Sequence, residues 1–182
     1  MDTRQAIKRD EDSEETWVLD PKYSTARFTI KGRFTRGIAG RFEQVSGTII
    51  RNGADVTRSR VEAAISSASI NSGSGRRDAK LKSAEWLDAE KWPEILFESL
   101  EVERRDRDTL LITGTLRLGG ISRKVALDVI EVDRSTSPRG EKLAYYAAKA
   151  RFDRFDFGLK KFLWGIGRQV EVAINIQAIR TH

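Results

Sequence analysis

The sequence predicts an all-β protein with a small helical insertion, built as an extended antiparallel barrel of about eight strands. Three observations lead to this fold class. Apolar and polar residues alternate with period two over most of the chain, short turn signals separate the alternating segments, and only one segment has helical spacing. Alternation of this kind is typical of strands with one face buried and the other in water.

The strands are expected in order along the chain. The clearest alternation lies in residues 26–31, 60–65, 110–118 and 170–176, and further strands are predicted within 17–31, 33–51, 94–103 and 142–157. The longest segments are expected to bend at glycines such as Gly37, Gly40 and Gly47. Gly119-Gly120 indicates a hairpin turn, because Val125, Leu127 and Val129 continue the apolar face on the return.

One helix and one boundary complete the predicted organisation. Ser74 to Leu87 has weak helical spacing with Ser74 as its cap, and Trp92-Pro93 ends that connection. Residues 1–16 contain the acidic run at 10–15 and are expected to form a disordered lead-in, while residues 17–182 form the barrel. No second domain and no repeat is evident in the sequence.

Composition excludes several kinds of chemistry. The chain has no Cys and a single His at its last position, His182. Disulfides, thiol catalysis and Cys-ligated metals are therefore ruled out, and His-based nucleophilic triads or metal sites are not expected. We predict no catalytic residues, no metal and no cofactor. The net charge of +6 raises nucleic acid as a partner, but acidic and basic residues interleave, as in 101–108, so a solvated surface is favoured.

The inward face mixes small and large residues. Ala63, Ser67, Ala148 and Ala150 are small, whereas the large apolar residues predicted on the same faces are Phe28, Ile30, Ile65, Phe97, Leu116, Leu127 and Phe152. This mixture would suit a long apolar tunnel. A solid core of alternating small and large residues is at least as consistent with the pattern.

Two polar segments are candidates for contact with a ligand. The Ser/Gly-rich loop 66–75 precedes Arg76-Arg77 and the predicted helix, so its backbone amides could attract a phosphate, although a plain loop is favoured. In Arg154-Phe155-Asp156-Phe157-Gly158, Arg154 and Asp156 could form a buried ion pair that fixes the closure of the barrel. Arg154 could equally face an anionic head group, and the structural role is favoured.

Taken in order, these pieces resemble the YceI-like family of lipocalin-like, polyisoprenoid-binding proteins. The resemblance runs from Trp17 to about Ile179. It rests on Trp17-Val18-Leu19-Asp20 with Ser24 and Phe28, Gly40-Arg41-Phe42 with Gly47, Arg77-Asp78 with Leu81, Pro93 to Ser99, Gly114 to Val125, and Arg154 to Leu159. Each motif is weak alone, but their order and spacing are specific.

The resemblance implies a lipocalin-like barrel whose tunnel takes an isoprenoid or quinone-like lipid, with the polar head near the opening. Proteins of this family are often periplasmic and often dimeric. The residues predicted to line the tunnel are Phe28, Ile30, Phe42, Ala63, Ile65, Leu81, Trp86, Phe97, Leu116, Leu127, Phe152 and Phe157. Arg77, Lys80 and Arg154 are predicted to orient the head group.

The sequence departs from the family pattern in two ways. Three positions where the family commonly has His are Tyr23, Gly32 and Lys80, so no imidazole role carries over. The first sixteen residues contain no apolar segment of the length that a secretory signal needs, and no apolar run is long enough for a membrane span. A cytoplasmic location is therefore expected, or a periplasmic one if a signal sequence has been removed.

The predicted function is non-enzymatic binding, transport or sequestration of a long apolar amphiphile inside the barrel. The alternatives are a structural or stress-related barrel with a filled core, a nucleic-acid-binding module, and an enzyme that acts on such a lipid. The last would need a carboxylate or Lys centre, since Cys is absent and the single His is terminal.

Overall fold

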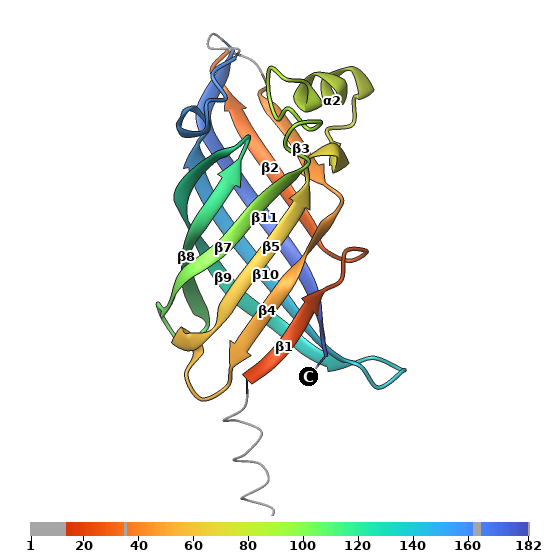
Figure 1. The fold of residues 1–182 in the computed structure, drawn as a ribbon, viewed down its shortest axis with the longest axis vertical. Coiled ribbons are helices and arrows are strands. Elements are labelled where there is room, and N and C mark those ends of the chain that lie inside the picture. The colour runs from red at the N-terminus through yellow and green to blue at the C-terminus, as the bar shows by residue number, and fades with distance from the viewer. Residues whose placement is uncertain (1–13, 35, 162–164, 182) are drawn as a thin grey trace, which may run out of the picture.

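The strands join edge to edge into one antiparallel sheet, which closes into a barrel where β1 (Glu14–Leu19) pairs with β11 (Ile166–Arg180) (Figure 1). The computed structural model describes residues 14–34, 36–161 and 165–181. Along the chain, the strands that follow β1 and precede β11 are β2 (Thr25–Gly32), β3 (Ile38–Phe42), β4 (Val45–Asn52), β5 (Arg60–Ser66), β6 (Ile70–Asn71), β7 (Glu94–Arg104), β8 (Thr109–Leu118), β9 (Ile121–Thr136) and β10 (Lys142–Asp153).

The eleven strands amount to eight long ones, three of which are interrupted. β1 and β2 both pair with β11, β4 and β3 pair with β1 and β2 respectively, and β5 and β6 pair with β4 and β3. Each of these pairs of segments therefore continues one line along the wall. The predicted fold class, a closed antiparallel barrel with one small helix, is confirmed. The segments predicted at 17–31 and 33–51 are interrupted at residues 20–24 and 43–44, and not at Gly37, Gly40 or Gly47, where bends were expected.

Alternating burial follows the alternating sequence. In β2, Ala26, Phe28 and Ile30 are buried, whereas Arg27, Thr29 and Lys31 between them are exposed. Gly119 and Gly120 both have positive φ, at 58° and 76°, and they connect Leu118 to Ile121 as the predicted two-residue hairpin. Positive φ at both central residues is the geometry of a type I′ turn, which matches the twist of the flanking strands.

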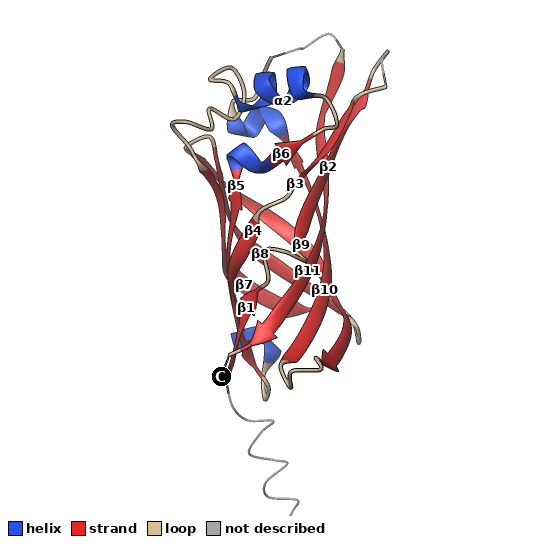
Figure 2. Cartoon of the chain, turned by 90° about the vertical axis from the view of Figure 1, so that its right-hand side faces the viewer, coloured by secondary structure: helices blue, strands red, loops and turns tan. Residues whose placement is uncertain are grey.

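The helical segments gather mainly at one end of the barrel (Figure 2). They are the 3₁₀ turns η2 (Ser67–Ser69) and η3 (Arg154–Phe157) and the helix α2 (Gly75–Lys82), while η1 (Val56–Arg58) lies at the opposite end. α2 is shorter than the segment 74–87 predicted for it, because residues 83–92 form a series of turns. Ser74 has the extended conformation of a cap residue, but its side chain makes no capping hydrogen bond.

Two further differences from the sequence prediction concern strand ends. β1 begins at Glu14, three residues before the predicted boundary, because Glu14 and Glu15 pair with Asn52 and Arg51 of β4. The remainder of the predicted lead-in, residues 1–13, lies outside the described residues, as does His182. β10 ends at Asp153, whose carboxylate accepts a hydrogen bond from Phe155 N and begins η3, so the strand predicted to 157 ends earlier.

Candidate functional site

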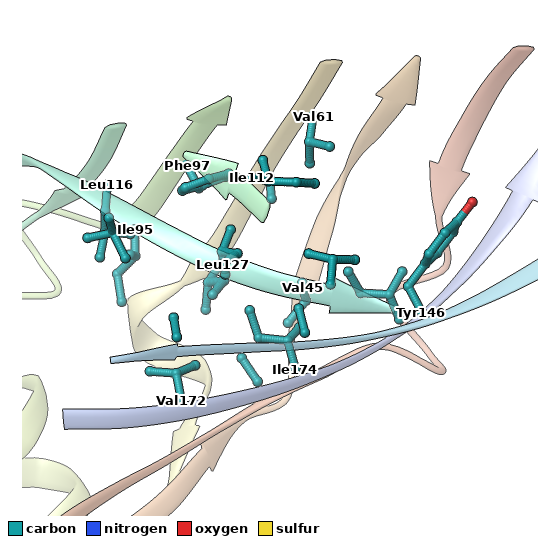
Figure 3. Close-up of a pocket in the computed structure, with 18 of the residues that line it drawn as sticks. Val45, Val61, Ile95, Phe97, Ile112, Leu116, Leu127, Tyr146, Val172 and Ile174 are labelled. Atoms are coloured by element: carbon teal, nitrogen blue, oxygen red, sulfur yellow. The ribbon is translucent and has the colours of Figure 1, made fainter. Parts of the chain in front are cut away.

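The barrel encloses a cavity of about 520 Å³. Its wall is built by the inward residues of the long strands, and Figure 3 shows apolar side chains from several strands directed into one common space. The interior is therefore not the solid core that the sequence left as an alternative. A volume of this size is in the range of ordinary small-molecule sites.

Eleven of the twelve residues predicted to line a tunnel are on the cavity wall. They are Phe28, Ile30, Phe42, Ala63, Ile65, Leu81, Trp86, Phe97, Leu116, Leu127 and Phe152. Phe157 is the exception. It is buried behind the wall, with its ring edge-on to that of Phe152 at 5.1 Å between centroids. That any of these residues contacts a ligand stays a prediction.

Small side chains leave the space open. Ala63, Ala148 and Ala150 lie on the wall, where Ala63 pairs with Phe97 of the adjacent β7 and Ala148 with Ile174 of the adjacent β11. Ser67, which was grouped with them, is instead buried outside the cavity wall and donates a hydrogen bond to the carbonyl of Trp92.

The two ends of the cavity differ in polarity and in exposure. At the end that carries α2, the wall consists of buried residues, namely Leu81, Trp86, Leu87, Arg154 and Leu159. At the opposite end, beside η1 and the β7–β8 turn, the wall includes Arg51, Ser59, Arg104, Arg107 and Asp108, which are half-buried or exposed. We call this second group the mouth. The cavity is therefore closed at the helix end and open at the mouth.

Arg154 belongs to the closed end and is fully buried. Its guanidinium donates to three main-chain carbonyls, those of Gly167 at 2.9 Å, Lys161 at 2.9 Å and Leu159. It also lies over the rings of Phe155 and Trp86, and burial lowers its pKa. The predicted ion pair with Asp156 is wrong, because Asp156 is exposed and Arg154 binds carbonyls instead. Arg154 holds η3 against the start of β11.

Arg77 and Lys80, also predicted near a head group, are on the exposed surface of α2 and not on the cavity wall. Arg77 donates to Ser72 Oγ at 2.8 Å and to the Ser72 carbonyl at 2.9 Å. Lys80 lies 3.8 Å from the Glu85 carboxylate. A ligand inside the cavity would not touch either side chain, so their role as head-group contacts gains no support from their position.

The Ser/Gly-rich loop 66–75 is occupied by a carboxylate of the protein itself. Asp78 accepts hydrogen bonds from Ser72 N at 2.8 Å and Ser72 Oγ at 2.5 Å. The bond from the Ser72 hydroxyl contributes most to holding the pKa of Asp78 below its usual value. Because Asp78 occupies these donors, the loop is not arranged as a free anion site.

Charged groups surround the inner side of the mouth. Glu15 is buried and accepts from Trp17 Nε1 at 3.0 Å, with Arg180 at 3.2 Å and Arg51 at 3.6 Å from its carboxylate. On β9, Arg134 donates hydrogen bonds to both carboxylate oxygens of Glu131. Arg51 and Glu131 line the cavity itself.

Tyr146 lines the cavity next to these charges (Figure 3). Its hydroxyl is buried and has no hydrogen-bond partner among the described residues. Burial, with a smaller contribution from the Glu131 carboxylate, raises the pKa of Tyr146 to about 12. The hydroxyl is therefore protonated in the physiological range and marks the boundary between the apolar cavity and its polar mouth.

In residues 14–34, 36–161 and 165–181, no group of three or more His, Asp and Glu side chains is placed to hold a metal ion. Within the same ranges, none of the helices has the length and apolar character needed to cross a bilayer.

The comparisons with known proteins agree with this architecture. The solved structure of BcnA from Burkholderia cenocepacia superposes with a TM-score of 0.78 at 16% identity, over 87% of this chain and 98% of that one. A polyisoprenoid binding domain from Saccharophagus degradans superposes with a TM-score of 0.66 at 14% identity, over 91% and 98%. These two likenesses concern the fold.

The sequence comparisons go further. A UPF0312 protein of Shewanella baltica is 28% identical over 166 residues, which cover 90% of this chain and 87% of the relative. The model of the YceI-like domain matches residues 17–178, which is nearly the whole barrel. The chain therefore belongs to the YceI-like family.

Proposed function

We propose that this protein binds and sequesters a long apolar amphiphile, such as an isoprenoid lipid or quinone, inside its barrel. The observation that carries the proposal is the apolar cavity, closed at the helix end and open at the mouth. Burial of a chain there would contribute about 0.8 kcal/mol per CH₂ group before ordering costs. The relative from Saccharophagus degradans, described as a polyisoprenoid binding domain, supports a chain of this class.

Binding without turnover fits the residues that line the cavity. The central part of the cavity wall is mostly aliphatic and aromatic, Arg154 is tied to carbonyls, and most other ionisable side chains on the wall lie at or beside the mouth. Among the residues that the structure describes, no pair of carboxylates lies on the apolar wall where a substrate chain would be held. Amphiphile storage or transfer needs only the cavity and its opening.

The polar head of the ligand is proposed to stay at the mouth. A chain that enters through the open end leads with its apolar tail, because burial of an unpaired polar head is costly. Arg51, Arg104 and Arg107 supply cationic donors at that end, against Asp108 and the Arg134-bound Glu131. This proposal differs from the sequence prediction, which put Arg77, Lys80 and Arg154 at the head.

Filling the cavity tests whether the chain lies inside it. Ala148→Phe places a ring on the wall from β10, and we expect at least about a tenfold loss of affinity for geranylgeraniol, about 1.4 kcal/mol. The matched control is Ala126→Phe, on the exposed outer face of β9. A prenylated quinone that enters the cavity quenches tryptophan fluorescence, and the affinity for geranylgeraniol is measured from the recovery of fluorescence as it displaces the quinone. If the wild-type protein carries no lipid by mass spectrometry and takes up neither compound, the proposed function fails.

Charge reversal at the mouth tests the position of the head. In Arg104→Glu/Arg107→Glu, we expect the preference for geranylgeranyl phosphate over geranylgeraniol to fall about tenfold. Arg76→Glu/Arg77→Glu at the helix end makes the same change in net charge and should leave that preference unchanged. The reverse pattern, with loss only in the second variant, would place the head where the sequence predicted it.

A further inference from the structure

Two segments at the end of the barrel opposite the mouth are basic and contain no acidic residue (Figure 2). In the sequence, residues 31–37 and 158–168 include six basic residues and no acidic one. The two segments are neighbours in space, because Arg33 N donates to the Gly165 carbonyl at 3.2 Å and Gly32 pairs with Ile166. Figures 1 and 2 show that the hairpin between β2 and β3 projects at this end.

Phe34 is the most exposed large apolar side chain among the described residues. It follows β2 on the β2–β3 hairpin, and its exposed fraction is 90%. Exposed aromatic side chains are common singly, so exposure alone indicates little. The surroundings of Phe34 are what give it significance, since Arg33 and Arg36 flank it in the sequence and are also exposed.

Four cations at this end have no ion-pair partner in the described part of the chain. Lys31 pairs with Glu171 at 3.4 Å, and Arg168 pairs with Asp153 at 2.6 Å. By contrast, Arg33, Arg36, Lys160 and Lys161 are exposed and form no ion pair with any residue in the described ranges. We define the basic tip as these four residues together with Phe34.

We propose that the basic tip docks the protein on an anionic lipid surface. Phe34 would enter the interface between head groups and acyl chains, and the four cations would meet the negative head groups. A projecting hairpin with one apolar side chain and exposed cations on two adjacent segments fits a bilayer better than nucleic acid, which is bound through several base or phosphate contacts over a large area.

This inference goes beyond the proposed function, because none of the five residues lines the cavity. The basic tip is at the closed end, so docking leaves the mouth facing away from the bilayer. Membrane association and uptake of a chain are therefore separate properties of the molecule and can be measured separately.

Co-sedimentation with vesicles tests the proposal. The full chain is mixed with vesicles of phosphatidylcholine, or of phosphatidylcholine with phosphatidylglycerol, at low and at physiological salt. We expect binding to the anionic vesicles, weakened by salt, and little binding to phosphatidylcholine alone. Phe34→Ser should lower the partition coefficient about tenfold, and Arg33→Glu/Arg36→Glu at least about twentyfold, since each cation at such a surface is worth about fivefold.

Controls separate local docking from general charge. Arg58→Glu/Arg139→Glu makes the same change in net charge at exposed positions away from the basic tip, and Tyr23→Ser removes another exposed aromatic ring. Both should bind vesicles within about twofold of wild type. Equal losses in test and control variants, no effect of Phe34→Ser, or tighter binding to a DNA duplex than to vesicles would overturn the proposal. Geranylgeraniol affinity should be unchanged in every variant, whatever the outcome for vesicles.

Discussion

Replacement of Arg154 by methionine is expected to lower the free energy of unfolding by about 3–5 kcal/mol. The guanidinium is fully buried and donates hydrogen bonds to the carbonyls of Leu159, Lys161 and Gly167. Methionine fills much of the volume but donates nothing, so the three carbonyls lose a charged donor. The closed end of the cavity should loosen as η3 separates from the start of β11.

Urea unfolding followed by circular dichroism measures the effect, with Arg168→Met as the matched control. Arg168 pairs with Asp153 at 2.6 Å, but its side chain is 60% exposed, so its loss should cost less than about 1 kcal/mol. Equal costs for the two variants would mean that Arg154 does not hold the end of the barrel. Arg154→Lys should recover little, because an ammonium lacks the fork that reaches three carbonyls.

The positions of the strands along the chain were predictable from the sequence because each strand has one buried face. Alternation in 26–31, 110–118 and 170–176 identified strands that the structure contains, whereas the interruption of 33–51 lies at residues 43–44 and not at a glycine. The end of β10 was not predictable in this way. Its last residues keep an apolar pattern, but the Asp153 side chain caps a 3₁₀ turn, and such a local hydrogen bond does not alter periodicity.

The cavity wall was largely predictable, whereas the cavity itself was not. Period two identifies which residues face inward, but it does not measure whether the inward side chains of opposite walls meet across the interior or leave space. That depends on the width of the closed barrel, which is set by strand number and register. The small residues Ala63, Ala148 and Ala150 were the only sequence feature that indicated an open interior. They lie on the cavity wall, as the predicted tunnel required.

The mouth was missed although a signal for it existed. Arg51 follows Ile49 by two residues, Arg104 follows Val102 by two, and Glu131 follows Val129 by two. Each therefore continues an inward face one step beyond its last apolar residue, and all three line the cavity. The sequence instead suggested Arg77 and Lys80 as head-group contacts, because they follow a loop rich in Ser and Gly. The loop sequence does not show that Asp78 already accepts the hydrogen bonds of Ser72 N and Oγ.

Gly114→Ala is the second variant with a large expected effect, a loss of about 2–3 kcal/mol in the free energy of unfolding. The Phe97 ring lies over Gly114 on the neighbouring strand, β8 against β7. A methyl group at position 114 would come to 2.4 Å from Phe97 Cζ and 2.5 Å from the Glu98 carbonyl oxygen. The ring can turn away, but the carbonyl is part of the sheet, so relief requires the two strands to separate.

Displacement of Phe97 also connects this glycine to the cavity. Phe97 lines the wall, and a ring forced inward would occupy space proposed for the ligand, so Gly114→Ala should weaken binding of geranylgeraniol as well as stability. Gly75→Ala is the control. It has no neighbouring atom within 4 Å of an added Cβ, and it lies in α2, where alanine should stabilise by about 0.4–1 kcal/mol.

A double variant separates the two contacts of Gly114. In Gly114→Ala/Phe97→Leu the smaller side chain removes the ring contact but leaves the contact with the Glu98 carbonyl. If the ring dominates, the double variant should be more stable than the sum of the single losses predicts, by about 0.5–3 kcal/mol of coupling. Additive losses would assign the cost to the backbone of β7. In that case Gly114 is needed for strand pairing and not for the position of Phe97 in the cavity.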